Sequence, residues 1–544
     1  MRQRRKIDIF DTTLRDGQQC PGAGMSFEKN IEYARLAAEL RIDVLEAGFP
    51  AASKIDFDIV KAIAQELGGD SSSPTIAALC QLRSEQVDLS IESLLPAVKN
   101  KKARLHTYVP VDPILMKASL GSRADKKGEI VEDLFQFVTR AVSAGLEVEF
   151  SPEGYSRMGE NLSFVTDLIR AALSAGARVI NCPDTIGGAS RFQGENYFVA
   201  HMSAHAEMMK REFPGNEIVW SMHCHNDFGL ALDNSLQGAF YGPATQIEGC
   251  FNGIGERAGN VALEQVIMAI EHFGKDVNSE VELYSDVDTT KLQKLSDFIR
   301  KYMLPRQPHW PIVGDNAMKH SSGGHTNAIL KNPLAYQPFD PREVGREISI
   351  VFGPLSGGNH AKALIEAAGY RCDDSEKADI AQYIKDVFKD RRKGVTDEEL
   401  LKGYFEFRKP IRIEKFEYRR DAGRSEVILT GSIFGRNGTH SEVHNGDDSA
   451  LAALKDLVDR EIPGLEIESY RSESEGQGIS ARSLSTIVVK TSSGEYWRGE
   501  GADGDIEISA LKAFLDAANR AFIEENFSQE KKPMSLASFQ EDCQ

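Results

Sequence analysis

The 544-residue sequence lacks the features that would place a protein in a membrane or outside the cell. No apolar run reaches the roughly 18 residues that a transmembrane helix needs, so we expect no membrane span. The basic N-terminus (Arg2, Arg4, Arg5, Lys6) leads directly into "IDIFDTTLRDG". Because this stretch has no apolar segment of the kind that a signal peptide carries, we expect no signal peptide.

The sequence also has few cysteines, and its net charge is negative. The seven cysteines are an odd number without regular spacing. They form no disulfide framework and indicate reduced thiols, so we expect a cytoplasmic protein. The formal net charge of -18 argues against nucleic acid or an anionic membrane as the main partner. We therefore expect a soluble protein with no nucleic-acid partner and no membrane partner.

Short apolar runs alternate with amphipathic stretches through the first half of the chain. Stretches such as "NIEYARLAAEL" carry apolar residues near i, i+3 and i+4, which is typical of helices. The apolar runs lie at residues 6–11, 43–49, 75–80, 104–109, 147–151, 178–183, 218–225 and 245–253. Eight strands alternating with helices over roughly 270 residues predict a (β/α)₈ TIM barrel. A doubly wound open sheet is the alternative, but eight evenly spaced units favour closure.

The pattern changes twice after the barrel. We expect a barrel domain over 1–275 and helical linker subdomains over 276–408, where the loops are rich in Pro, Gly and His. A separate α+β domain is predicted over 409–523, from strand-like segments such as "SEVILTGSI" and helical ones such as "ALAALKDLVDR". Residues 524–544 are polar, and we expect them to form a disordered tail.

Polar residues cluster where the predicted strands end, which is the edge at which a (β/α)₈ barrel carries its chemistry. In chain order they are Arg15, Asp16, Glu46, His106, Glu153, Asp184, Thr185, His223, His225 and the "NGIGERAGN" segment at 252–260. That segment lacks the GxGxxG spacing and follows the eighth strand, so it does not predict a dinucleotide site. We expect these residues to line one rim.

The His223–His225 pair sits one residue apart at the end of the seventh strand. Residues i and i+2 of a strand point to the same face, so we expect both imidazoles to point toward the same place. Together with a carboxylate from Asp16 they would make a three-ligand site for Mg²⁺, Mn²⁺ or Zn²⁺, with positions left open for substrate oxygens. An isolated His-x-His is more often a pair of hydrogen-bonded barrel residues. Arg15, Asp16 and Glu153 on the same rim favour the metal.

Three motifs carry a resemblance: "DTTLRDGQQ" (11–19), "HCHNDFG" (223–229) and "NGIGERAGN" (252–260). In this order on a barrel, they resemble the isopropylmalate/homocitrate/citramalate synthase family of the DRE-TIM metallolyase group. The resemblance implies condensation of acetyl-CoA, as co-substrate, with a 2-oxo acid, followed by thioester hydrolysis. It also extends to the α+β domain, which looks like that family's leucine-binding regulatory domain and implies leucine as a possible effector.

The resemblance assigns roles to individual residues. Asp16, His223, His225 and Asn260 match metal-binding positions. Arg15 matches the arginine that holds the keto oxygen, Thr185 a contact of the 2-oxo acid, and Glu153 an active-site glutamate. His325 in "SGGHTNA" resembles the histidine proposed as general base, and Tyr336 resembles a nearby tyrosine. In the family, both of these come from the partner subunit of a domain-swapped homodimer. Without that context His325 would be a solvated loop histidine.

Two positions bear on which 2-oxo acid is used. His106 in "RLHTYV" matches the isopropylmalate-forming branch, and the small Ser151 leaves room for a branched chain. Both favour 2-oxoisovalerate, which would give 2-isopropylmalate and CoA in the first step of leucine biosynthesis. Citramalate or homocitrate synthesis is the alternative, because the segments "TYVPVD" and "GHTNAILKN" differ from the usual sequence of the family at these places. A hydroxymethylglutaryl-CoA-lyase-like activity and a non-catalytic amino-acid sensor are less favoured.

Overall fold

The computed structural model describes residues 3–69, 72–275, 281–390, 394–421, 423–446, 449–476 and 482–529. The chain forms two compact units. The first comprises the described residues up to Met318 together with Phe339–Glu347, and the second comprises Lys319–Pro338 together with the described residues from Ile348 onward.

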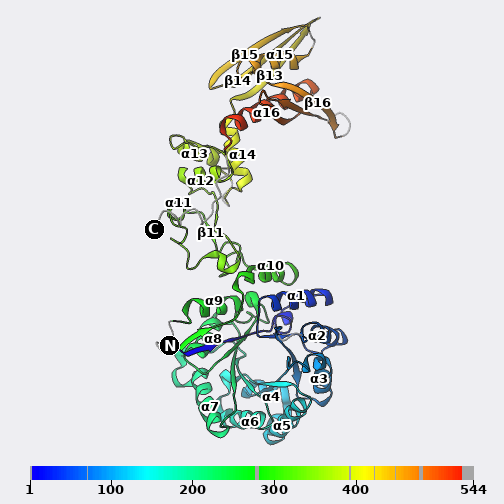
Figure 1. Ribbon diagram of the computed structural model, residues 1–544, viewed down its shortest axis with the longest axis vertical. Coiled ribbons are helices and arrows are strands. Elements are labelled where there is room, and N and C mark those ends of the chain that lie inside the picture. Colours follow the sequence, from blue (N-terminus) through cyan, green and yellow to red (C-terminus); the bar gives the residue numbers. More distant parts are fainter. Residues whose placement is uncertain are drawn as a thin grey trace. The chain divides into compact units, whose positions relative to one another are not determined.

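The first unit is built on a closed barrel of parallel strands (Figure 1). Its strands are β2 (Asp8–Asp11), β3 (Val44–Glu46), β4 (Thr75–Gln81), β5 (Ala103–Pro110), β6 (Glu147–Glu153), β7 (Val179–Asp184), β8 (Val219–Cys224) and β9 (Gln246–Gly249). Strand β2 pairs with β9, from Asp8 opposite Gln246 to Asp11 opposite Gly249. This pairing closes the sheet. The predicted (β/α)₈ barrel is confirmed, and the open sheet is excluded.

Helices surround the barrel because each one has an apolar face to bury against the strands. In α1, for example, Ser26 caps the N-terminus by accepting a hydrogen bond from the Lys29 amide, while Ile31 and Ala34 are buried. The helices of this unit are α1 (Phe27–Glu39), α2 (Lys54–Leu67), α3 (Ser84–Val98), α4 (Pro113–Leu120), α5 (Lys127–Ser143), α6 (Leu162–Ser174), α7 (Phe198–Glu212), α8 (Ala231–Phe240), α9 (Leu263–Phe273) and α10 (Leu292–Tyr302). The loops that follow the strands are thereby held at one rim.

A short extra sheet completes the first unit. Strand β1 (Gln3–Lys6) pairs in parallel with β10 (Val281–Tyr284), a pairing that the sequence did not predict. Leu283, Leu292 and Val344 belong to the same hydrophobic core as the barrel. The barrel core therefore extends well past residue 275.

The second unit begins with short helices around a small core of its own. Its first elements are β11 (Lys319–His320), α11 (Gly323–Ile329), β12 (Ser349–Ile350), α12 (Gly358–Ala367), α13 (Lys377–Val387) and α14 (Asp397–Arg408). Phe352, Ile365, Ile384 and Tyr404 are among the buried side chains of this core. The mainly helical character predicted for this region agrees with these elements.

The α+β part of the second unit contains two antiparallel sheets. One is made of β13 (Ile411–Asp421), β14 (Arg424–Ile433) and β15 (Arg436–Asn445), the other of β16 (Glu466–Glu475), β17 (Arg482–Lys490) and β18 (Tyr496–Asp503). Helices α15 (Ala450–Asp459) and α16 (Ile506–Phe527) share a core with these strands. The predicted α+β domain is confirmed. The expected disordered tail is wrong for residues 524–527, which belong to helix α16, and the part from residue 530 lies outside the described residues. The boundaries at 275 and 408 stay predictions.

Two further observations concern the described residues. None of their helices is both long enough and apolar enough to cross a membrane. Their cysteines (Cys20, Cys80, Cys182, Cys224, Cys250 and Cys372) are free thiols.

Candidate active site

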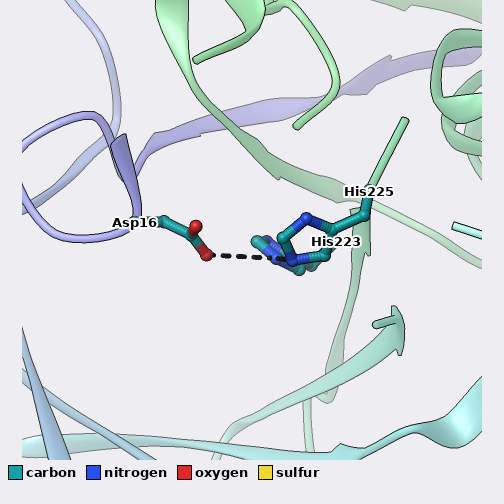
Figure 2. A group of neighbouring side chains, drawn as sticks. All are labelled: Asp16, His223 and His225. Carbon is teal, nitrogen blue, oxygen red and sulfur yellow. Dashed lines mark hydrogen bonds and ion pairs between the residues drawn. The ribbon is translucent and has the colours of Figure 1, made fainter. Parts of the chain in front are cut away.

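The three side chains predicted to bind a metal lie together at the carboxyl ends of the barrel strands. Asp16 lies on the turn after β2, His223 is in β8, and His225 directly follows β8. Figure 2 shows the Asp16 carboxylate facing the two imidazoles from a different element. Asp16 Oδ2 lies 3.5 Å from His223 Nε2, and the two Nε2 atoms lie 3.4 Å apart. These separations are short enough for the three side chains to hold one divalent cation.

Charge and burial prepare Asp16 and His225 to bind a cation. Burial would raise the pKa of Asp16, but the adjacent Arg15 and the two histidines outweigh it and hold that pKa well below its usual range. Burial, reinforced by His223, lowers the pKa of His225 to about 4. Near neutral pH the group therefore offers an ionised carboxylate and a neutral imidazole at His225, which are the forms that metal ions bind.

Asn260 is brought to the same place by the loop after β9. It forms an antiparallel bridge with His225 and is 1% exposed. Among the described residues, neither Asp16 Oδ1 nor Asn260 Oδ1 accepts a hydrogen bond, although both oxygens are buried. A buried acceptor without a partner costs about 1–3 kcal/mol. A divalent cation would satisfy both oxygens, so the donor set fits Mg²⁺, Mn²⁺ or Zn²⁺.

Arg15 is fixed by three carboxylates. Its Nε donates to Glu46 Oε2 at 2.5 Å, its Nη1 donates to Asp16 Oδ2 at 2.7 Å, and its Nη2 lies 3.3 Å from Glu248 Oε1. These contacts occupy three of the five N–H donors of the guanidinium. The remaining donors belong to a side chain that lines the central cavity. Arg15 can therefore hold a substrate oxygen while its own orientation stays fixed.

His106 lies deeper in the barrel, between an acid and a hydroxyl. Its Nδ1 is 2.8 Å from Glu46 Oε1, and its Nε2 is 2.8 Å from Ser151 Oγ. Asn181 Nδ2 donates to the same Ser151 oxygen at 2.9 Å. Burial works against a charge on His106, but the carboxylates of Glu46 and Glu248 outweigh it and raise its pKa to about 9. An imidazolium here would donate from both nitrogens and leave the Ser151 hydroxyl hydrogen free for a ligand.

Glu153 and Thr185 complete the predicted set on the rim. Burial raises the pKa of Glu153, and Arg15 opposes that shift. A carboxyl group with a raised pKa can exchange protons nearer to neutral pH. Thr185 Oγ1 accepts a hydrogen bond from the Gly154 amide at 2.9 Å, which ties the loops after β6 and β7 together. One cavity is lined by Arg15, Asp16, His106, Ser151, Glu153, Thr185, His223 and His225.

Several residues around this cavity were not predicted as functional. Glu248, Asn181 and Tyr108 line it. Glu256 and Arg257, from the 252–260 segment that was expected on the rim, line it as well. The available signal for Glu248 was a charged residue within the apolar run "TQIEGCF". A buried charge is costly unless it is paired, so an acid within a core strand indicates a buried partner of opposite charge or a hydrogen-bond donor.

His325 and Tyr336 belong to the second unit. His325 is on α11 and is exposed. Its ring stacks on Tyr336, with centroids 3.9 Å apart and an interplanar angle of 16°. The structure thus brings these two predicted residues together.

Comparisons with known proteins identify the family to which this chain belongs. Residues 6–299 match the HMGL-like family, 312–393 the homocitrate synthase post-HMGL domain-like family, and 401–522 the LeuA allosteric (dimerisation) domain. A 2-isopropylmalate synthase of Chromobacterium violaceum is 33% identical over 96% of this chain and 98% of its own length. The chain belongs to the 2-isopropylmalate synthase family. As a family member it is an enzyme.

Other members of the family are similar over the same extent. The 2-isopropylmalate synthase of Aquifex aeolicus is 34% identical over 96% of this chain and 97% of its own length. That of Heliobacterium modesticaldum is 32% identical over 95% of this chain and 97% of its own length. The family resemblance inferred from the three motifs is confirmed.

Proposed function

We propose that this enzyme condenses acetyl-CoA with 2-oxoisovalerate in a Claisen-type reaction and hydrolyses the thioester, which gives 2-isopropylmalate and CoA. The observation that carries the proposal is the convergence of Arg15 with Asp16, His223 and His225 in one cavity. The convergence supports the proposal because a fixed guanidinium beside a bound cation could hold a keto oxygen as it becomes an alkoxide.

The side chains have separable roles in this reaction. Asp16, His223, His225 and Asn260 would hold a divalent cation, which supplies Lewis-acid polarisation of the keto group when bound. Arg15 donates hydrogen bonds to the keto oxygen, and its charge opposes the negative charge that develops there. Glu153, with its raised pKa, is placed to transfer a proton at the rim.

The inner wall of the cavity supports a branched 2-oxo acid. Ser151 is small, and Leu79 adds an apolar surface to the same cavity. A hydroxyl that accepts hydrogen bonds from His106 and Asn181 can donate its own hydrogen to a substrate carboxylate. One or two methylene groups change binding by about 1–3 kcal/mol, so side activity on other short 2-oxo acids is expected.

A panel of 2-oxo acids assayed with acetyl-CoA tests the substrate. Release of free thiol from CoA is followed with 2-oxoisovalerate, pyruvate and 2-oxoglutarate, and the product is identified by mass spectrometry. We expect kcat/KM to be highest for 2-oxoisovalerate. If kcat/KM were much higher for pyruvate than for 2-oxoisovalerate, the protein would instead be a citramalate synthase.

We propose that His325 acts as the general base on the acetyl methyl group, assisted by Tyr336, and that the partner subunit of a homodimer supplies both. The match to the LeuA dimerisation domain supports a dimer, and an exposed His325 stacked on Tyr336 suits a residue completing another subunit's site. Mixing inactive His325→Ala and His223→Ala subunits tests this. If the subunits pair at random, about half of the dimers are heterodimers, and one of the two sites in each heterodimer is intact. About a quarter of wild-type activity should therefore return. No recovery would show that each subunit uses its own His325.

We further propose leucine as an effector of the α+β domain and the cytoplasm as the location. The first rests on the match of 401–522 to an allosteric domain, and the second on the free thiols of the described cysteines. Titrating leucine into the assay tests regulation. An unchanged rate together with no binding heat would refute it.

A further inference from the structure

Glu248 is a buried acid at the centre of the barrel mouth. It lies in β9 and is 0% exposed. On one side it is paired in register with His223 of β8, and on the other with Phe10 of β2, the strand that leads to Arg15 and Asp16. The closed sheet therefore places this carboxylate between the two segments that supply the cation ligands.

The Glu248 carboxylate contacts three site residues at once. Its Oε1 lies 3.3 Å from Arg15 Nη2 and 3.4 Å from His223 Nδ1. Its Oε2 accepts a hydrogen bond from Asn181 Nδ2 at 2.9 Å. An unpaired carboxylate inside a barrel would be strongly destabilising. The hydrogen bonds from Arg15 and Asn181, with the His223 ring close by, account for its presence there.

The position of this carboxylate relative to His223 has a chemical consequence. The imidazole presents Nδ1 to Glu248 and Nε2 to Asp16 and His225. A carboxylate beside Nδ1 favours the ring hydrogen on that nitrogen, which leaves the lone pair of Nε2 for a bound cation. Glu248 Oε1 also contacts Arg15 Nη2, on the guanidinium whose Nη1 donates to Asp16.

We propose that Glu248 is a positioning residue that sets the tautomer and ring orientation of His223 and the orientation of Arg15. The inference rests on the proposed cation site and adds a residue to which no role has been assigned. It differs from general structural support of the barrel, because it predicts a specific loss of metal affinity.

Glu149 offers a matched control. It is another fully buried barrel acid, on β6, and its carboxylate accepts hydrogen bonds from Arg104 at 2.9 Å and from Gln246 at 3.0 Å. No hydrogen bond or ion pair among the described residues joins Glu149 to Arg15, Asp16, His223 or His225. Glu149→Gln and Glu248→Gln therefore make the same substitution at two buried acids of the same barrel, but only Glu248 contacts the residues of the cation site.

The experiment measures Mn²⁺ binding to the full-length protein by electron paramagnetic resonance of free Mn²⁺, independently of activity. Loss of a residue that orients a metal ligand typically weakens metal binding about 10–100-fold, and we expect this weakening for Glu248→Gln. Glu149→Gln should bind Mn²⁺ like the wild type, even if its thermal stability falls. Glu248→Asp keeps the charge but withdraws the carboxylate by one methylene group, so its Mn²⁺ affinity should lie between those of Glu248→Gln and the wild type.

The outcomes separate this inference from the proposed function. Equal Mn²⁺ affinity of wild type and Glu248→Gln would overturn the positioning role, as would an equal loss in Glu149→Gln. If Glu248→Gln does not fold, a Glu248→Asp variant with wild-type Mn²⁺ affinity and an unchanged Co²⁺ absorption spectrum would also overturn it. A wild-type protein that binds no Mn²⁺, Co²⁺ or Zn²⁺ would instead contradict the proposed metal-assisted function itself.

Discussion

Replacing Gly255 by alanine should damage the active site without removing any of its functional groups. Gly255 belongs to the "NGIGERAGN" segment and has a φ of +150°, a backbone conformation that L-residues rarely adopt. A Cβ atom at this position would lie 2.3 Å from Asn260 Nδ2 and 3.4 Å from Asp16 Oδ1. Since ordinary contacts are about 3.5–4.0 Å, the Asn260 amide must move by about 1 Å.

The magnitude follows from two contributions. A non-glycine residue in a sparsely populated backbone region costs about 1–3 kcal/mol. Forcing an extra carbon into a packed site costs about another 1–3 kcal/mol. We expect Gly255→Ala to destabilise the first unit by about 2–6 kcal/mol. Because a 1 Å misplacement of a site group can cost about 100-fold in rate, kcat/KM should fall by about that factor.

Gly438→Ala is the control for the backbone contribution. Gly438, in β15 of the second unit, has a φ of +157°, and no atom lies within 4 Å of an added Cβ. The Gly438→Ala protein should lose stability only through the strained backbone conformation. It should keep the Mn²⁺ affinity and the turnover of the wild type. Calorimetry, Mn²⁺ titration and the thiol-release assay give the three readouts. A Gly255→Ala protein with the Mn²⁺ affinity and turnover of Gly438→Ala would refute the reasoning.

Three further predictions concern charge, pH and metal. Arg15→Lys keeps the charge but cannot reach three carboxylates with one ammonium group, so steady-state kinetics should show kcat/KM lower by about 100–1000-fold. Burial lowers the pKa of His205 to about 4 from 6.5, while Tyr155 and Thr166 hydrogen-bond its two ring nitrogens. Only the unfolded chain then gains this proton, so calorimetry should show about 3 kcal/mol of stability lost as pH falls from 6.5 to 4, and His205→Asn should lose less. Chelation should abolish turnover and lower the melting temperature, and Mn²⁺ should restore both; full activity of chelated, metal-free protein would contradict the site.

The sequence alone determined the periodic features of this protein. Alternating apolar runs and amphipathic stretches predicted eight strands and their helices, because a buried parallel strand and a surface helix have different hydrophobic periods. The spacing of His223 and His225 predicted a shared face, because side chains alternate along a strand. Arg15, Asp16 and Glu153 could be placed on the rim because each follows a strand.

Ring closure and register decided the rest. The pairing of β2 with β9 sets Glu248 between the segments that carry Arg15 and His223, although 233 positions separate Arg15 from Glu248. No local pattern records which side chains meet across a closed barrel, because each strand's period fixes only the face and not the neighbour. The alternation along each strand therefore determined which groups point inward. Only the tertiary structure decided which carboxylate pairs with which guanidinium or imidazole.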